Sequence, residues 1–191
     1  MSLSLKSVRN DEFGPMSDSK LREEIFDLLY TKQKPEVAVL RLNRVLEGDP
    51  SNEEAISFKA YALNKLANAT KDWNYTKNAL ASADKALPIN PVNDFALVSK
   101  GWALIDLGNA REAIPCLVRA TTTNPNNEYA WYNLAWAQFL TGNSAESSSS
   151  IAKALELSPN NAIIRRGRRM MMTGNLPAHL RKSTLSDSYR H

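Results

Sequence analysis

The sequence predicts an all-α protein in which a helix-turn-helix unit of about 34 residues is repeated about four times. Similar segments end at prolines in positions 50, 91, 125 and 159, so the intervals between them are 41, 34 and 34 residues. An asparagine follows each proline by two residues, and its side chain can accept a free backbone N–H at the start of the next helix. Gly-Asn pairs at 108–109 and 142–143 indicate the end of one helix and the start of another between these prolines.

The residues between these breaks resemble the tetratricopeptide repeat (TPR) motif, which reads Trp-x2-Leu-Gly-x2-Tyr, then Ala-x3-Phe, a later Ala and a closing Pro. In segment 128–161 the matching positions are Trp131, Leu134, Ala135, Gln138, Ser147, Ile151, Ala154 and Pro159. In segment 94–127 they are Leu97, Lys100, Gly101, Leu104, Ala113, Leu117, Ala120 and Pro125. Segment 53–93 keeps the small residues but has about seven extra residues around 68–74. The first segment, 19–52, is degraded and retains Leu29, Ala38, Leu42 and Pro50.

The resemblance implies a right-handed superhelix of about four helix pairs over residues 18–174, ending in a capping helix at 162–174. One side of that last helix is apolar and faces the array, with Ile163, Ile164, Gly167, Met170 and Met171. Its arginines occupy the opposite side. Residues 1–17 and 175–191 carry no periodic apolar pattern long enough to fold. Both are expected to be flexible arms, of which the second is basic.

Composition and cysteine content limit the class of protein. The chain is 43% hydrophobic and 23% charged, as in ordinary globular proteins. It has no apolar run that would span a bilayer and no apolar signal region near its start, so we expect no membrane insertion. Cys116 is the only cysteine, which excludes an intramolecular disulfide and a cysteine-based zinc cluster. A reducing, cytoplasmic location is the simplest interpretation.

The helix expected after Asn127 carries apolar side chains on two faces. Its TPR-motif positions pack against the partner helix, which predicts that Trp131 is core. The other aromatic residues recur at a spacing of 3, 4 and 3, and the previous repeat has the same spacing. In the TPR family this second face lines a concave groove that holds extended peptides or partner helices. The expected groove residues are Tyr61, Phe95, Val98, Trp102, Ile105, Tyr129, Tyr132, Trp136, Phe139 and Arg166.

The alternative for this second stripe is that it is core, as apolar stripes on helices usually are. The motif positions already supply a core face, however, and six half-exposed aromatic side chains would leave roughly 500 Å² of apolar surface or more. Toward the N-terminus the stripe becomes polar, with Lys20, Glu23 and Asp27 before Tyr30, which predicts an acidic entrance to the groove. Either arm could also fold back into the groove, since each carries leucines and an aromatic residue.

The sequence offers little for catalysis. His179 and His191 fall in the expected C-terminal arm, and Cys116 is expected to be a packing residue. There is no glycine-rich phosphate loop and no metal-ligand spacing, so neither a cofactor nor a metal is expected. The predicted function is non-catalytic: an adaptor, scaffold or small chaperone that holds an extended or helical segment of another protein.

Two other functions stay open. Residues 162–191 contain seven Lys or Arg and one Asp, whereas residues 1–161 are slightly acidic. The cluster of Arg165, Arg166, Arg168 and Arg169 is either a solvated outer face or a site for nucleic acid or an acidic surface. Nucleic acid is the weaker choice because aromatic residues for base stacking are missing beside it. The third possibility is a self-assembling structural repeat protein, a homo-oligomer in which the groove docks on a neighbouring copy.

Overall fold

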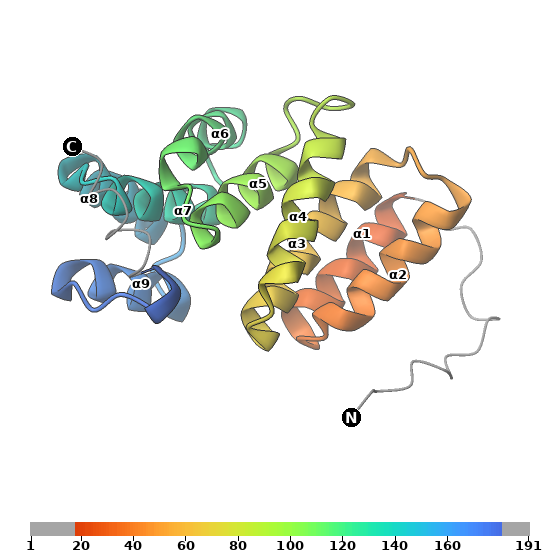
Figure 1. Ribbon diagram of the computed structural model, residues 1–191, viewed down its shortest axis with the longest axis horizontal. Helices are drawn as coiled ribbons and strands as arrows, with labels where there is room; N and C mark the ends of the chain where they lie inside the picture. The colour runs from red at the N-terminus through yellow and green to blue at the C-terminus, as the bar shows by residue number, and fades with distance from the viewer. Residues whose placement is uncertain (1–17, 181–191) are drawn as a thin grey trace.

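The computed structural model describes residues 18–180, which form an array of helices without a β-strand. The elements are α1 (Asp18–Phe26), the π-helical turn η1 (Asp27–Thr31), α2 (Pro35–Gly48), α3 (Glu53–Thr70), α4 (Trp73–Ala86), α5 (Asp94–Asp106), α6 (Ala110–Thr123), α7 (Glu128–Leu140), α8 (Ser144–Leu157) and α9 (Ala162–Thr173). Figure 1 shows an elongated array with α1 and α2 at one end and α8 and α9 at the other. The all-α repeat architecture expected from the sequence is confirmed.

Consecutive helices form antiparallel pairs, and the first helices of successive pairs also contact each other. The pairs are α3 with α4, α5 with α6, and α7 with α8, while α5 lies between α3 and α7. The degraded first pair, α1 and α2, is held by Leu21, Ile25 and Leu42, which are buried. An ion pair of 3.0 Å between buried Arg41 and Glu24 joins the same two helices.

The expected helix caps explain where the first helix of each pair begins. The side-chain oxygen of Asn52 accepts the backbone N–H of Ala55 at 2.9 Å, and Asn93, Asn127 and Asn161 cap α5, α7 and α9 in the same way. Asn109 and Asn143 hold the N-cap positions of α6 and α8 but make no side-chain cap bond. Gly108 and Gly142 adopt the positive φ angles of 88° and 84° that end α5 and α7.

Small residues allow the two helices of a pair to approach closely. A Cβ atom on Gly101 would lie 2.4 Å from Cγ of Leu117, so α6 packs directly on the backbone of α5. The two departures from the motif are each accommodated by a specific contact. Lys100 reaches Asp84 of α4 in an ion pair of 2.7 Å. The hydroxyl of Ser147 donates to the carbonyl of Ala135 at 2.9 Å, which satisfies it in the core.

The extra residues of the second repeat lengthen its first helix. α3 has 18 residues, whereas α5 and α7 have 13 each. It ends at Lys71, which has a φ of 61°, and α4 begins two residues later at Trp73. The longer α3 therefore places Trp73 at the end of the array's edge formed by the helix-pair turns, where a later segment of the chain contacts it.

The C-terminal part departs from expectation in two ways. In α9, Ile164, Gly167 and Met171 are buried as expected of a terminal helix, but Ile163 is 55% exposed. Residues 175–180, expected to belong to a flexible arm, lie on the array, because Leu180 is buried in the core cluster and Leu176 packs against it. Residues 1–17 and 181–191, the remainder of the two expected arms, are outside the described residues.

Candidate functional site

The helices α1, α3, α5 and α7, with the η1 turn, surround a hollow of about 510 Å³. Its apolar and aromatic lining consists of Phe26, Tyr30, Tyr61, Phe95, Val98 and Tyr129. Its polar and charged lining consists of Arg22, Asp94, Asn124, Asn126, Asn127 and Glu128. We call this hollow the aromatic groove. Because its residues come from four repeats, the groove forms only when the repeats stack.

The rings around the aromatic groove form a continuous network. Phe26 stacks on Tyr30 with ring centroids 5.4 Å apart and meets Phe95 edge-on at 5.7 Å. Tyr61 contacts Tyr30 at 6.2 Å, Phe95 at 6.0 Å and Trp102 at 5.9 Å. Stacked and edge-to-face arrangements are the favourable geometries for such pairs. Each ring holds its neighbours, so the apolar walls are formed without a ligand.

The π-helical turn determines which residues of the first repeat reach the groove. An i→i+5 turn contains one residue more than an α-helical turn, so residues before it are rotated relative to a regular α-helix. Arg22, Phe26 and Tyr30, spaced four apart, consequently line the groove together. The α-helical pattern instead predicted Lys20, Glu23 and Asp27, and the expected acidic entrance is therefore wrong. Sequence reasoning missed Arg22 and Phe26 because nothing in the pattern indicated the extra residue.

Two tyrosine hydroxyls meet in the wall of the groove. The hydroxyl of Tyr30 donates to that of Tyr61 at 2.7 Å. Burial raises the pKa of Tyr30 to about 12, and it raises the pKa of the more deeply buried Tyr61 well above its usual value. The ammonium of Lys65 lies 4.3 Å from the centre of the Tyr30 ring, and burial lowers the pKa of this lysine. The hydroxyl pair stays protonated at neutral pH and keeps this part of the wall uncharged.

The polar rim of the groove is tied to the helix caps. Asp94 accepts hydrogen bonds from Asn124 at 2.7 Å and from Asn127 at 3.1 Å. Asn127 in turn caps α7 through the backbone N–H groups of Tyr129 and Ala130. On the opposite side Arg22 forms an ion pair of 2.6 Å with Glu54 of α3. The rim thus has fixed amide and carboxylate groups on one side and an arginine on the other.

Comparisons with known proteins place this architecture. Residues 98–162 match the tetratricopeptide repeat family model. The chain is a TPR protein. Similar solved structures include MamA, which is 18% identical with a TM-score of 0.59, over 90% of this chain and 91% of that chain. Another is the TPR protein TTC0263 of Thermus thermophilus, 20% identical with a TM-score of 0.62, over 79% of this chain and 81% of that one.

A third solved structure of the same fold is described as having a ligand site. YrrB, a TPR protein with an unusual peptide-binding site, is 22% identical with a TM-score of 0.54. The alignment covers 84% of this chain and 77% of that chain. No curated protein sequence matches the chain significantly. At these identities the neighbours establish the TPR fold, in which the first helices of the pairs carry the groove residues.

The structure brings together only part of the expected groove. Tyr61, Phe95, Val98 and Tyr129 line the aromatic groove, and Trp102 supports Tyr61 from the side. The other expected residues lie further along the array, away from this hollow: Ile105, Tyr132, Trp136, Phe139 and Arg166. The concave stripe of this TPR array is therefore divided into two regions.

The C-terminal region of the stripe is covered by the chain itself. Ile105, Trp136 and Leu180 belong to one buried cluster, and Leu176 packs against it. The imidazole of His179 lies 4.7 Å from the Trp73 ring, and its Nε2 is 3.5 Å from a carboxylate oxygen of Asp106. Residues 176–180 thus return from α9 to the ends of α4 and α5. Of the two expected arms, the start of the C-terminal one does fold back onto the array.

Burial reverses the expected roles of two tryptophans. Trp136, expected to be an open groove residue, is only 6% exposed. Trp131, expected to be core, is partly exposed, and its indole N–H donates to the carbonyl of Pro125 at 2.9 Å. The large open aromatic surface expected from the second stripe is therefore wrong in this region, because α9 and residues 176–180 cover it.

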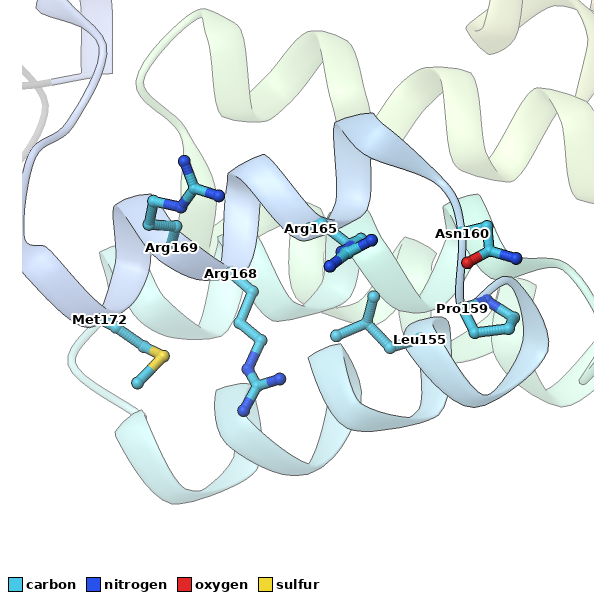
Figure 2. A pocket seen from close by; sticks show the side chains of 7 residues that line it. All are labelled: Leu155, Pro159, Asn160, Arg165, Arg168, Arg169 and Met172. Atoms are coloured by element: carbon cyan, nitrogen blue, oxygen red, sulfur yellow. The ribbon is translucent and has the colours of Figure 1, made fainter.

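The arginine cluster also separates into two positions. Arg165, Arg168 and Arg169 line a second hollow of about 510 Å³ between α8 and α9, whereas Arg166 lies outside it. Figure 2 shows Arg165 and Arg168 extending from α9 toward α8, where Leu155 and Pro159 lie. All four arginines are exposed. The predicted basic patch is thus a surface feature of the last helix, with one part of it beside a cavity.

The remaining candidates provide no assembled chemistry. Burial raises the pKa of Cys116, which disfavours the thiolate form that a nucleophile needs. Within residues 18–180 no group of three or more His, Cys, Asp or Glu side chains has the arrangement of a metal site. In the same residues no helix is both long enough and apolar enough to cross a bilayer. His191 lies outside the described residues.

Proposed function

We propose that this TPR protein is a non-catalytic adaptor, scaffold or small chaperone that holds a peptide segment of another protein in the aromatic groove. The observation that supports this is the preformed hollow of about 510 Å³ with aromatic walls and a polar rim. Its volume falls within the range of about 300–1,000 Å³ typical of ligand sites. One neighbour of the same fold, YrrB, is described as having a peptide-binding site.

The lining suggests what the bound segment contributes. An aliphatic or aromatic side chain of the ligand would fill the space between Tyr30, Phe95 and Tyr129, where rings from three repeats meet. Burial of such an anchor in a preformed pocket accounts for most of the affinity of typical peptide sites. The amide groups of Asn124 and Asn126 at the rim are suited to hydrogen bonding with the backbone of an extended segment.

The test selects peptides from a random library with the whole chain and measures the affinity of the selected peptides for variants by fluorescence anisotropy. Tyr30→Ala removes the most exposed aromatic side chain of the groove and should weaken binding about tenfold or more. Tyr75→Ala is the matched control, because Tyr75 is partly buried on α4 and does not line the groove. Peptides that bind both variants as tightly as the original chain would place the site elsewhere and contradict the proposal.

A further inference from the structure

The last helix of the array is the first member of a fifth pair. Arg165, Arg168, Arg169 and Met172 lie 34 residues after Trp131, Leu134, Ala135 and Gln138, the positions through which α7 packs on α8. In α7 these positions are covered: Leu134 and Ala135 are buried, and Gln138 accepts a hydrogen bond from Ser150 of α8. In α9 the equivalent positions are exposed, so within residues 18–180 no second helix covers them.

The place of that second helix is an elongated hollow. The cavity shown in Figure 2 shares Leu155, Arg168 and Met172 with a neighbouring cavity, also of about 510 Å³. The neighbouring cavity is lined mainly by α8 and the end of α9, with Ile151, Ala152 and Met171 among its residues. We call the two cavities together the end groove. Its floor is largely apolar, and Met172 is 75% exposed beside it.

The charges around the end groove have one sign. Arg165, Arg168 and Arg169 stand at its rim, and none of them forms an ion pair within residues 18–180. The chain's own next segment does not supply the complement. Leu176 and Leu180 pack into the core cluster instead. The last residues, 181–191, contain three Lys or Arg and one Asp, which is the wrong sign for an arginine-lined rim.

We propose that a partner protein inserts an acidic amphipathic helix into the end groove, where it takes the place of the second helix of the fifth pair. An apolar stripe of that helix would cover Leu155 and Met172, and flanking carboxylates would meet Arg165 and Arg168. This site is separate from the aromatic groove, because the two share no lining residue. It therefore gives the chain a second partner surface at the end of the array.

A helix fits the end groove better than the other anionic partners do. Nucleic acid would satisfy the arginines, but single strands also require exposed rings for stacking, and the cavity in Figure 2 has none in its lining. A membrane surface would meet a protruding face, whereas the apolar residues here line a recess between two helices. The recess has the period and the helix partner, α8, that receive a second helix elsewhere in the array.

The test uses a designed peptide of 14 residues, the length of α8. It carries the apolar residues of α6 at the spacing of Ala113, Leu117 and Ala120, and glutamate at most other positions. Binding to the whole chain is measured by fluorescence anisotropy. Arg168→Glu should weaken binding about tenfold or more, whereas Arg166→Glu, the same charge change on the same helix outside the end groove, should change it less than about threefold.

A second pair of variants separates apolar contact from charge. Met172→Asp should weaken binding about tenfold, and Ile163→Asp, which changes another exposed residue of α9, should have little effect. Both sites are exposed, so neither change should unfold the protein, and circular dichroism checks this. Equal losses for Arg168→Glu and Arg166→Glu, or equal binding of a peptide with lysine for glutamate, would overturn the proposal. So would tighter binding of a single-stranded RNA oligonucleotide or of anionic vesicles that the end-groove variants abolish.

Discussion

The two regions of the concave stripe are built from the same repeat positions, yet one is open and the other is closed. In the N-terminal region, Tyr30, Phe95 and Tyr129 border a hollow. In the C-terminal region, Trp136 is buried under the end of the chain, in one cluster with Leu180. The difference does not come from the stripe, which is aromatic in both regions. It comes from the segment after the last repeat, because α9 and residues 176–180 lie only over the C-terminal region.

The closed region should therefore behave as core, and the largest expected effect tests this. Trp136→Ala should lower the free energy of unfolding by about 3–5 kcal/mol, the range for removing a buried aromatic side chain. Trp131→Ala should cost clearly less, because this side chain is partly exposed and loses mainly one hydrogen bond and some packing. Urea unfolding followed by circular dichroism measures both. Equal costs would mean that the closed region is less tightly covered than the structure shows.

The fold was predictable from the sequence because its signals are local. The Asn93 and Asn127 caps, the turn at Gly142 and the close approach at Gly101 each depend on a few neighbouring residues, and each occurs in the structure. The motif spacing carried these local signals into a repeat. The architecture of helix pairs follows from them without knowledge of distant contacts.

The site was predictable only in part because coverage is not local. Tyr61, Phe95 and Tyr129 could be assigned to the groove from their spacing. The role of Phe26 depends on a π-helical turn, whose extra residue rotates the start of α1, and no motif position marks that turn. The burial of Trp136 depends on Leu180, which is more than 40 residues later in the chain and carries no periodic pattern.

An intermediate effect is expected where α9 closes the C-terminal region. A Cβ atom on Gly167 would lie 2.5 Å from a ring carbon of Tyr132, so the α9 backbone rests directly on that ring. Gly167→Ala should therefore cost about 1–3 kcal/mol in the free energy of unfolding, as overpacking typically does. Gly48→Ala is the matched control, since a Cβ atom there has nothing within 4 Å.

The contact is isolated by repeating the Gly167 change in a Tyr132→Ala background. Removing the ring should abolish most of the penalty, because the clash is with its atoms Cε2 and Oη. A penalty that persists without the ring would mean that Gly167 is required for another reason. In that case α9 would not close the region through Tyr132, and the contrast between the two regions would rest on Leu180 and its neighbours alone.

The smallest expected effect concerns the open region and appears only at high pH. Burial raises the pKa of Tyr30 from 10.0 to about 12, so the folded protein holds this proton more tightly than the unfolded chain does. The resulting stabilisation is complete below about pH 10 and is lost as the pH rises from about 10 to 12. Tyr30→Phe cannot ionise there, so the free energy of unfolding of this variant should fall less over that range.

The comparison needs a control because Tyr61 ionises in the same wall, with a pKa raised well above its usual value by burial, and remains in the Tyr30→Phe variant. Tyr75→Phe, which removes a hydroxyl on α4 outside the groove, should keep the pH dependence of the original chain. At neutral pH, Tyr30→Phe should cost only about 0.5–1.5 kcal/mol, the net contribution of one hydrogen bond. If urea unfolding gives parallel pH profiles for Tyr30→Phe and the original chain, the Tyr30 hydroxyl is hydrated, and the groove wall is more open than its 2.7 Å contact with Tyr61 indicates.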